Sequence, residues 1–168
     1  MANKSISSKS ENLSTVRRGP PVSPILLRLI NPLLKALLRS PFHSRVSGQL
    51  MLLTFTGRKT GKKFSTPVGY LRKGNQVLVF THSAWWKNFI GSAPVSLRIQ
   101  GRELQGIAQP VSDPQAVHSM VLDLIAANGE ERSRQMGFWV QPGATTAEVA
   151  QAVQGTFFVP IELTGEAR

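Results

Sequence analysis

Alternating apolar and polar residues in the middle of the chain predict short β-strands joined by tight turns. Pro160 favours an edge or bulge position for the last strand, because proline donates no hydrogen bond to a neighbouring strand. About six hairpin-connected strands with few crossover helices predict a mainly antiparallel α+β fold, a small closed or split β-barrel with flanking helices. The predicted strands are residues 50–55, 64–71, 76–81, 95–100, 103–108 and 156–163.

Residues 23–39 carry leucine and isoleucine at helical spacing, with basic and polar residues along the opposite stripe. The pattern predicts a basic amphipathic helix, which is too short and too charged to span a bilayer. Pro32 predicts a kink or a division of this helix, with Asn31 as the cap of its second half. The apolar face from Ile25 to Leu38 has two interpretations: it packs against its own domain, or it lies on an anionic membrane surface.

Two more helices are predicted in the second half of the chain by capping boxes that begin at Ser112 and Thr145. The first is expected to end at Asn128 and the second near Val153. Residues 130–143, between them, show no period and are expected to be irregular.

The length of 168 residues predicts one domain that is large enough to bury a hydrophobic core. Residues 1–22 are rich in Ser, Lys and Pro, and we interpret them as a flexible basic tail rather than a secretory signal. Residues 23–168 then form the single domain, including the helix at 23–39. The chain has no cysteine and only three scattered histidines, which predicts no disulfide and no metal site. We expect a cytoplasmic location.

The net charge of +11 is concentrated in the first part of the chain. Residues 1–74 hold 14 Lys and Arg but a single acid, whereas residues 75–168 hold 6 Lys and Arg and 8 acids. A field of this kind attracts an anionic partner. A phosphorylated small molecule, an acidic lipid surface and nucleic acid all remain open on charge alone.

The densest group of cations lies in the predicted hairpin loop from Gly57 to Lys63, whose sequence is GRKTGKK. Two glycines bracket a turn with four cations, a hydroxyl and, we expect, freely presented backbone N–H groups. Such a tip is a natural cradle for oxyanions. The alternative is an ordinary solvated hairpin loop, because Gly supplies positive φ angles and Lys keeps a tip soluble.

Sequence motifs exclude several functions. The loop is not a nucleotide-binding P-loop, because its glycine spacing is one residue short and a strand follows where a helix is needed. The chain has no GxGxxG dinucleotide fingerprint and no GxSxG nucleophile elbow. An enzyme with so few acid–base groups takes its chemistry from a cofactor.

Three stretches carry a resemblance to a known family: TGRKTGKKFSTPVGYLRKGNQVLVF, the helical segment around WWKNF, and PVSLRIQGRELQGIAQPV. Over about residues 40–110 the chain resembles the deazaflavin-dependent nitroreductase/quinone reductase family, whose members are similar to split-barrel enzymes of the FMN-binding and pyridoxamine-phosphate-oxidase type. The family uses coenzyme F-420, a deazaflavin whose tail carries a phosphodiester and glutamates. The resemblance implies hydride transfer to a quinone, a nitro compound or an enone.

The resemblance also implies which residues bind the cofactor and the acceptor. The hairpin is expected to hold the phosphate, and the strand around Pro67 is expected to line the ring. The cofactor-binding residues are then Arg58, Lys59, Thr60, Gly61, Lys63, Pro67, Val68 and Gly69. We expect Tyr70, Trp85 and Trp86 near the ring and the substrate, and Phe138 and Trp139 in the substrate pocket. Ordinary core or rim packing is the alternative for each aromatic residue.

Two differences from the family lie at the cofactor site. Phe64 stands where many relatives have a basic residue, and Lys63 precedes it by one position, which on a strand points to the other face. The loop before the Trp element is shortened to His82-Ser83-Ala84. FMN is therefore the alternative cofactor.

Three hypotheses follow. The first is a deazaflavin-dependent oxidoreductase that acts on a small-molecule electron acceptor, with peripheral contact to the inner face of the membrane and homodimer formation as further expectations. The second is a non-catalytic or FMN-using split barrel that binds a planar or acyl ligand. The third is nucleic-acid binding, which the charge alone prompts and which the lack of interleaved exposed aromatic residues disfavours.

Overall fold

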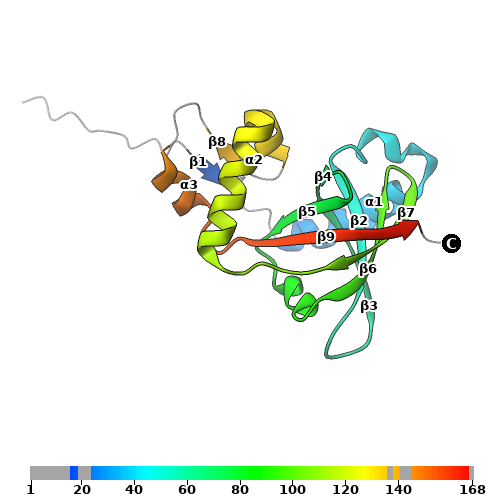
Figure 1. Ribbon diagram of the computed structural model, residues 1–168. Coiled ribbons are helices and arrows are strands. Elements are labelled where there is room, and N and C mark those ends of the chain that lie inside the picture. The colour runs from blue at the N-terminus through cyan, green and yellow to red at the C-terminus, as the bar shows by residue number, and fades with distance from the viewer. Residues whose placement is uncertain (1–15, 19–23, 136–137, 141–144, 167–168) are drawn as a thin grey trace, which may run out of the picture.

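The computed structural model describes residues 16–18, 24–135, 138–140 and 145–166 (Figure 1). Its helices are α1 (Pro24–Arg39), η1 (Pro41–Arg45), η2 (Ala84–Phe89), α2 (Pro114–Gln135) and α3 (Thr146–Ala152). Its strands are β1 (Val16–Arg18), β2 (Leu50–Thr56), β3 (Lys63–Gly69), β4 (Leu71–Lys73), β5 (Gln76–Thr81), β6 (Ala93–Ile99), β7 (Arg102–Ala108), β8 (Phe138–Val140) and β9 (Phe157–Glu166).

Seven strands form one antiparallel sheet in the order β3-β2-β6-β7-β9-β5-β4. The two edge strands, β3 and β4, are neighbours in the chain and are separated only by Tyr70. A sheet whose opposite edges are joined by one residue must curl until those edges meet. The fold is therefore the expected split β-barrel, and the segment predicted as one strand at 64–71 is divided between both sides of the split.

The barrel interior contains the main hydrophobic core. Residues on alternate positions of β6, Val95, Leu97 and Ile99, are all buried, as their alternation with polar residues predicts. The most deeply buried members of the core are Met51, Leu53, Val77, Val79, Phe89, Leu97, Val159 and Ile161. Burying each of these apolar side chains contributes about 2 kcal/mol to the free energy of folding. This core is therefore the main source of the barrel's stability.

Two hairpin turns occur at the glycines from which the sequence predicted them. The strand β5 spans Gln76–Thr81 and is entered through the Gly74-Asn75 turn, and β6 and β7 pair around the turn at Gly101. Gly74 and Gly101 both adopt positive φ angles, of 60° and 80°. Glycine reaches this region without steric cost, so these turns are encoded locally.

The predicted edge or bulge position of Pro160 is wrong, because β9 lies between β7 and β5 inside the sheet and its register shift with β7 lies at Gln105/Gly106, away from Pro160. Pro160 pairs with Leu78 of β5, and its carbonyl oxygen accepts a hydrogen bond from Gln109 N–H, one residue beyond the end of β7. In an antiparallel strand the N–H and C=O of one residue point to the same side. The N–H that proline lacks would thus point toward Gln109, just beyond the end of β7. Its absence therefore interrupts no hydrogen bond within strand β7.

The helix α1 runs unbroken from Pro24 to Arg39, so the predicted division at Pro32 does not occur. A proline inside a helix costs about 3 kcal/mol. Contacts of α1 with β2, β3 and η1, and the burial of Leu38, offset this cost. Packing of the helix on the barrel is thus confirmed for its C-terminal end.

The second half of the chain differs from the prediction at three places. The start of α2 is capped by Asp113 rather than Ser112, because the Asp113 carboxylate accepts the Ala116 N–H at 2.8 Å. The helix α2 continues to Gln135 through Gly129, and the strand β8 follows within the segment 130–143 that was predicted as irregular. The strand β1, inside the predicted tail 1–22, pairs with β8 in a two-stranded sheet. Strands of three residues carry too little pattern to be seen, and their pairing joins segments far apart in the chain. The rest of the tail lies outside the described residues.

Among the described residues, none of the helices is both long and apolar enough to cross a membrane.

Candidate functional site

The loop between β2 and β3 is a closed turn. Gly57 N–H donates to the Lys62 carbonyl oxygen at 2.8 Å, and Gly61 N–H donates back to the Gly57 carbonyl oxygen at 2.8 Å. Gly61 has a φ of 66°, which permits this closure. We call residues 57–62 the tip.

The expected free N–H groups are mostly absent from the tip. Besides the two glycines, Thr60 N–H donates to the Gly57 carbonyl oxygen and Lys62 N–H to the Thr60 hydroxyl. Arg58 N–H donates to Asn88 of η2. A six-residue turn satisfies its own donors to stay compact, so any anion held here is bound chiefly by side chains.

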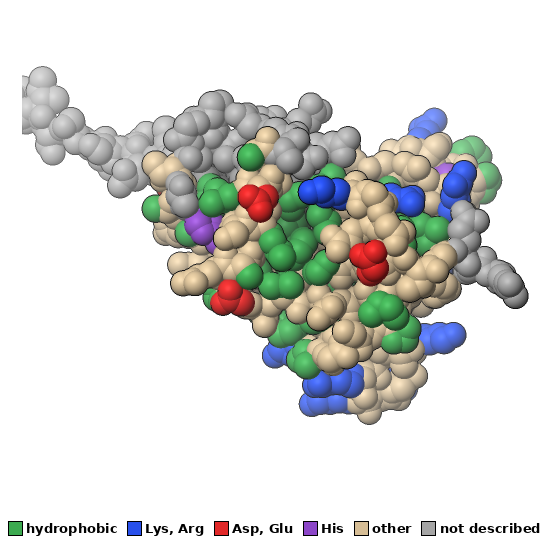
Figure 2. Space-filling model, in the orientation of Figure 1, with side chains coloured by type: hydrophobic (Ala, Val, Ile, Leu, Met, Phe, Trp, Pro, Cys, Tyr) green, Lys and Arg blue, Asp and Glu red, His purple; other side chains and the backbone are tan. Residues whose placement is uncertain are grey.

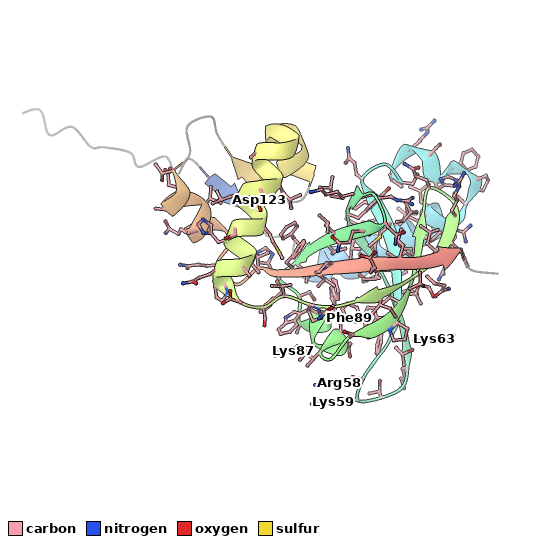
Figure 3. The ribbon with its side chains drawn as sticks, in the orientation of Figure 1. Arg58, Lys59, Lys63, Lys87, Phe89 and Asp123 are labelled. Carbon is pink, nitrogen blue, oxygen red and sulfur yellow. The ribbon has the colours of Figure 1, made fainter. Side chains whose placement is uncertain are left out.

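Cationic side chains surround the tip. Arg58, Lys59 and Lys62 are exposed and come from the tip itself, and Lys87 is added from η2 (Figure 3). Figure 2 shows Lys and Arg gathered at this lower end of the molecule. Within the described residues none of these cations forms an ion pair with a carboxylate. Lys87 is not among the cofactor-binding residues expected from the sequence, because only the fold brings η2 beside the tip.

Lys63 occupies a different surface. It begins β3 opposite Thr56 and lines a shallow pocket of about 200 Å³ together with Thr54, Ser96 and Gln105. The adjacent Phe64 pairs with Phe55 on the other face of the sheet. The one-residue offset therefore separates Lys63 from the aromatic side of the tip, as the alternation of a strand requires.

Phe64 packs over the beginning of the tip. Its ring lies 5.8 Å from the ring of Phe55 in a stacked arrangement, and a Cβ on Gly57 would come within 2.6 Å of it. Phe64 is still 45% exposed. In this chain an aromatic face therefore stands beside the cations of the tip.

Asn88 joins the tip to η2. Its Oδ1 accepts the Arg58 N–H at 3.0 Å, and its Nδ2 donates to the Trp85 carbonyl oxygen at 2.8 Å. One side chain therefore fixes the distance between the cationic turn and the aromatic helix. The sequence singled out Asn88 as part of a motif but gave no reason for its presence.

Replacing Asn88 with alanine is expected to release the tip. Loss of two hydrogen bonds costs roughly 0.5–1.5 kcal/mol each, and Arg58 N–H should lose its protection from hydrogen exchange. Asn88→Asp is the matched control, because it keeps the acceptor for Arg58 and removes only the donor to Trp85. NMR measures the hydrogen-exchange rate of the Arg58 amide. If this exchange stayed as slow in Asn88→Ala as in wild type, Asn88 would not hold the tip.

The two indoles of η2 have different neighbours. Trp85 lies in an aromatic cluster with Phe55 and Phe89, at centroid distances of 5.9 and 5.6 Å. Trp86 stacks on Phe157 at the start of β9, at 4.2 Å and with an interplanar angle of 23°. Both indoles are half-buried. They line the surface that leads from the tip toward the first residues of β9.

The strand β3 places Pro67, Val68 and Gly69 at the edge of the sheet. They pair with residues of β2, and all three are half-buried. Proline is tolerated here because an edge strand has one unpaired side. The structure thus places these three residues on the strand that follows the tip, several residues beyond its end.

Tyr70 is held inside the barrel. Its hydroxyl donates to the Ser47 carbonyl oxygen at 2.8 Å, and its ring belongs to the buried core. Burial raises the pKa of the Tyr70 phenol above its usual value of 10.0, and the charge of Arg72 lowers it by a smaller amount. The structure therefore engages the Tyr70 hydroxyl in a buried contact with Ser47.

This pKa predicts a loss of stability at high pH. Because the folded pKa lies above the unfolded one, the contribution of Tyr70 is fully present below about pH 10 and is lost as the pH rises through the folded value. Tyr70 is the single tyrosine, so the absorbance of tyrosinate reports it directly. We expect its titration to be displaced to higher pH in the folded protein. Unfolding by urea should show a smaller difference between wild type and Tyr70→Phe above about pH 10 than below it.

Phe138 and Trp139 lie at the opposite end of the molecule from the tip. They belong to β8, which pairs with β1 and lies against α2 (Figure 1). The structure does not bring these two residues together with Arg58 and Lys59.

A pocket of about 400 Å³ lies between the first turns of α2, the end of α3 and the start of β9. His118, Gln154, Thr156 and Phe157 are among its lining residues. The Thr156 hydroxyl is 2.9 Å from His82 Nε2, and Phe157 carries the stacked Trp86. We call this the β9 pocket. Sequence reasoning missed it, because its walls come from three distant segments.

The barrel, its cationic tip and the aromatic helix beside it are the features that a protein for a flat, anionic cofactor needs. The model of the F-420H(2)-dependent quinone reductase family matches residues 40–138, which is more than half of the chain. The chain belongs to this family, and it is therefore an oxidoreductase that uses coenzyme F-420. The resemblance predicted from the sequence is confirmed.

Three solved structures with a similar fold are distant in sequence. An F-420H2-dependent reductase is 17% identical, with 68% of this chain and 94% of that chain covered and a TM-score of 0.44. A conserved hypothetical protein from Mycobacterium tuberculosis is 14% identical, with coverages of 89% and 88% and a TM-score of 0.48. An FAD-binding protein from Mesorhizobium loti is 16% identical, with coverages of 91% and 99% and a TM-score of 0.42. A comparison with curated proteins gives no match.

Proposed function

We propose that this protein transfers hydride from reduced coenzyme F-420 to a quinone, and that the tip and η2 hold the coenzyme. The observation that carries the proposal is the hydrogen-bonded junction at Asn88, which places the cations beside the indoles. Quinone is the acceptor named by the family model; a nitro compound and an enone are the other acceptors that the sequence suggested.

The residues present fit the coenzyme. A tail with a phosphodiester and glutamates needs several cations, and Arg58, Lys59, Lys62 and Lys87 supply them without competing carboxylates among the described residues. A flat ring needs an apolar surface, which Trp86 and the half-buried residues of β3 supply. Because the backbone donors of the tip are used internally, Arg and Lys side chains carry the attraction.

The β9 pocket is the proposed acceptor site. It adjoins the aromatic helix through the stacking of Trp86 on Phe157, and its volume of about 400 Å³ suits a single aromatic ring system. When bound, the coenzyme supplies a hydride, and a quinone needs a proton as well to become a hydroquinone. His118 lines the pocket, and His82 Nε2 lies 2.9 Å from the Thr156 hydroxyl at its edge. These imidazoles are the groups that would hold and deliver that proton.

Trp86 and Phe157 have a positioning role in this proposal. Their stacked rings form an apolar surface that runs from the coenzyme side to the mouth of the β9 pocket, so the coenzyme ring and the acceptor would meet over it. Holding two reactants at contact distance and excluding water accounts for much of the rate gain in such reactions. The chain needs no covalent group of its own for this task.

The test is a turnover assay with reduced coenzyme F-420 under anaerobic conditions. We expect a quinone such as menadione to restore the visible absorbance of the oxidised coenzyme faster than a nitroaromatic compound or an enone does. His118→Phe should lower kcat more than it lowers coenzyme affinity. Tight coenzyme binding without turnover on any acceptor would make the protein a non-catalytic binding module instead.

We also propose that the region around α1 and η1 makes peripheral contact with anionic lipid. Leu33 is 70% exposed and Phe42 is 68% exposed, and the exposed cations Arg39 and Arg45 belong to the same two elements. Apolar side chains flanked by cations are the pattern of interfacial binding. The packed end of α1 at Leu38 leaves these residues free for such contact.

Leu33→Gln/Phe42→Ser is expected to reduce cosedimentation with vesicles that contain phosphatidylserine. Neutral phosphatidylcholine vesicles and the Ile107→Gln variant, which removes an exposed apolar residue of β7, are the controls. If wild type and the double variant cosedimented equally with these vesicles, the proposed lipid contact through α1 and η1 would be wrong. Homodimer formation stays a prediction, which sedimentation equilibrium in the same buffer would measure.

A further inference from the structure

A second pocket lies between α2 and the strands β4, β5 and β9, away from the tip. Its volume is about 260 Å³. Its floor is apolar, and all but one of the floor residues are buried; the exception, Met120, is half-buried. The floor residues are Leu71, Leu78, Met120, Leu124 and Phe158. We call it the α2 pocket.

Charged residues stand on the two sides of the α2 pocket. Arg72 and Lys73 line it from β4, and Asp123 lines it from α2. Figure 2 shows apolar surface between a red carboxylate and blue side chains, and Figure 3 labels that carboxylate as Asp123. In the described part of the chain, Asp123 forms no ion pair with either cation. The two cations and Asp123 therefore line the same pocket without lying within salt-bridge distance of one another.

The β4 side is fixed in place by its turn. Arg72 Nε donates to the Gly74 carbonyl oxygen at 3.3 Å, which holds the guanidinium at the start of the β4–β5 turn. The next residue, Lys73, is also exposed at this rim. Lys73 leaves β4 on the same face as the floor residue Leu71, so its ammonium group is the donor nearest an anion above the apolar floor, while Arg72 adds positive charge from the neighbouring position.

We propose that the α2 pocket binds a small amphiphilic carboxylate, an apolar body with a single carboxylate head, such as a short fatty acid. The apolar body covers the floor, and the head accepts a hydrogen bond from Lys73 and is attracted by the charge of Arg72. Asp123 repels the head from the α2 side and so sets its direction. The volume is slightly below the roughly 300–1,000 Å³ of drug-sized ligand sites, so a short acyl chain fits better than a large ring system.

The charge pattern decides between ligand classes. An amine would meet one carboxylate and two cations, so it is disfavoured. A polyanion would gain from the cations but would lose at Asp123 and at the apolar floor, where it cannot be solvated. The site is separate from the tip and from the β9 pocket, so it does not depend on the proposed hydride transfer.

The first test is calorimetric titration of the full chain with octanoate, octanol and octylamine, which share one chain length and differ in charge. We expect one saturable site for octanoate, binding of octanol weaker by roughly 2- to 10-fold, and weaker binding still for octylamine. Arg72→Gln/Lys73→Gln should reduce the affinity for octanoate to that for octanol. Asp123→Asn should raise it by about 2-fold.

The second test locates the site. Met120→Trp fills the pocket and should abolish octanoate binding while leaving the affinity for coenzyme F-420 unchanged. Arg39→Gln/Arg45→Gln removes the same charge from α1 and η1 and should leave octanoate binding unchanged. In wild type, octanoate should also shift the NMR signal of the Met120 methyl group, which keeps the test valid if Met120→Trp does not fold.

Three results would overturn the proposal. They are equal affinity for octanoate and octylamine, an unchanged affinity in Met120→Trp, and an unshifted Met120 methyl signal at saturating octanoate. If the Arg39→Gln/Arg45→Gln variant instead lost binding, the amphiphile would be bound at the surface of α1 and not in the α2 pocket.

Discussion

Replacing Arg58 and Lys59 together with alanine is expected to weaken the binding of coenzyme F-420 by roughly 10-fold or more, which corresponds to about 1.4 kcal/mol or more. Both side chains are exposed and lack carboxylate partners among the described residues, so their charge is available to the anionic tail. The loss should be larger at low ionic strength, because salt screens exposed charges. Quenching of tryptophan fluorescence during titration measures the affinity, since Trp85 and Trp86 lie beside the tip.

The matched control is Arg39→Ala/Arg45→Ala, which lowers the net charge equally on exposed residues of α1 and η1. If both double variants weakened binding to the same degree, a general electrostatic field and not the tip would attract the coenzyme. Wild-type affinity in Arg58→Ala/Lys59→Ala would remove the tip from the site altogether. Titration with FMN in parallel should give weaker binding, because FMN lacks the glutamates of the tail.

The features that the sequence predicted correctly are those that neighbouring residues determine. The turn at Gly74-Asn75 and the capping box of Thr145 and Glu148 depend on contacts within a few positions, and both occur as predicted. The burial of Val95, Leu97 and Ile99 follows from strand alternation alone.

The features that the sequence did not predict depend on pairing between distant segments. No local signal shows that the chain crosses from one barrel edge to the other at Tyr70, or that β9 lies inside the sheet despite Pro160. The same holds for the site. Charge density located the tip, but only the fold brings Lys87 to it and joins His82 to Thr156.

Tertiary structure also changed the expected chemistry of the tip. The two glycines suggested open backbone donors, yet a turn of six residues uses them to hold itself closed. We therefore expect an anion held here to be recognised by the side chains of the tip and by the aromatic surface of Phe64 and η2. A hairpin with a basic residue in place of Phe64 would add charge at the cost of that surface.

Phe89 anchors the helix η2 and is expected to be the most sensitive residue near the site. Its side chain, labelled in Figure 3, is fully buried, and its ring packs edge-on against the ring of Phe55 at a centroid distance of 5.2 Å. Phe89→Ala should lower the free energy of unfolding by roughly 3–5 kcal/mol, a large part of the 5–15 kcal/mol typical of a domain. Urea denaturation followed by circular dichroism measures this loss.

Coenzyme affinity should fall in the same variant, because Phe89 fixes the helix that carries Lys87, Asn88 and Trp86. Phe89→Leu keeps most of the apolar volume and should lose roughly half as much stability. Ile90→Ala, at a neighbouring residue that is 48% exposed, should change stability by no more than about 0.5 kcal/mol. If Phe89→Ala lost stability but bound the coenzyme as tightly as wild type, η2 would serve the core and not the cofactor. Coenzyme binding would then depend on the tip alone and not on η2.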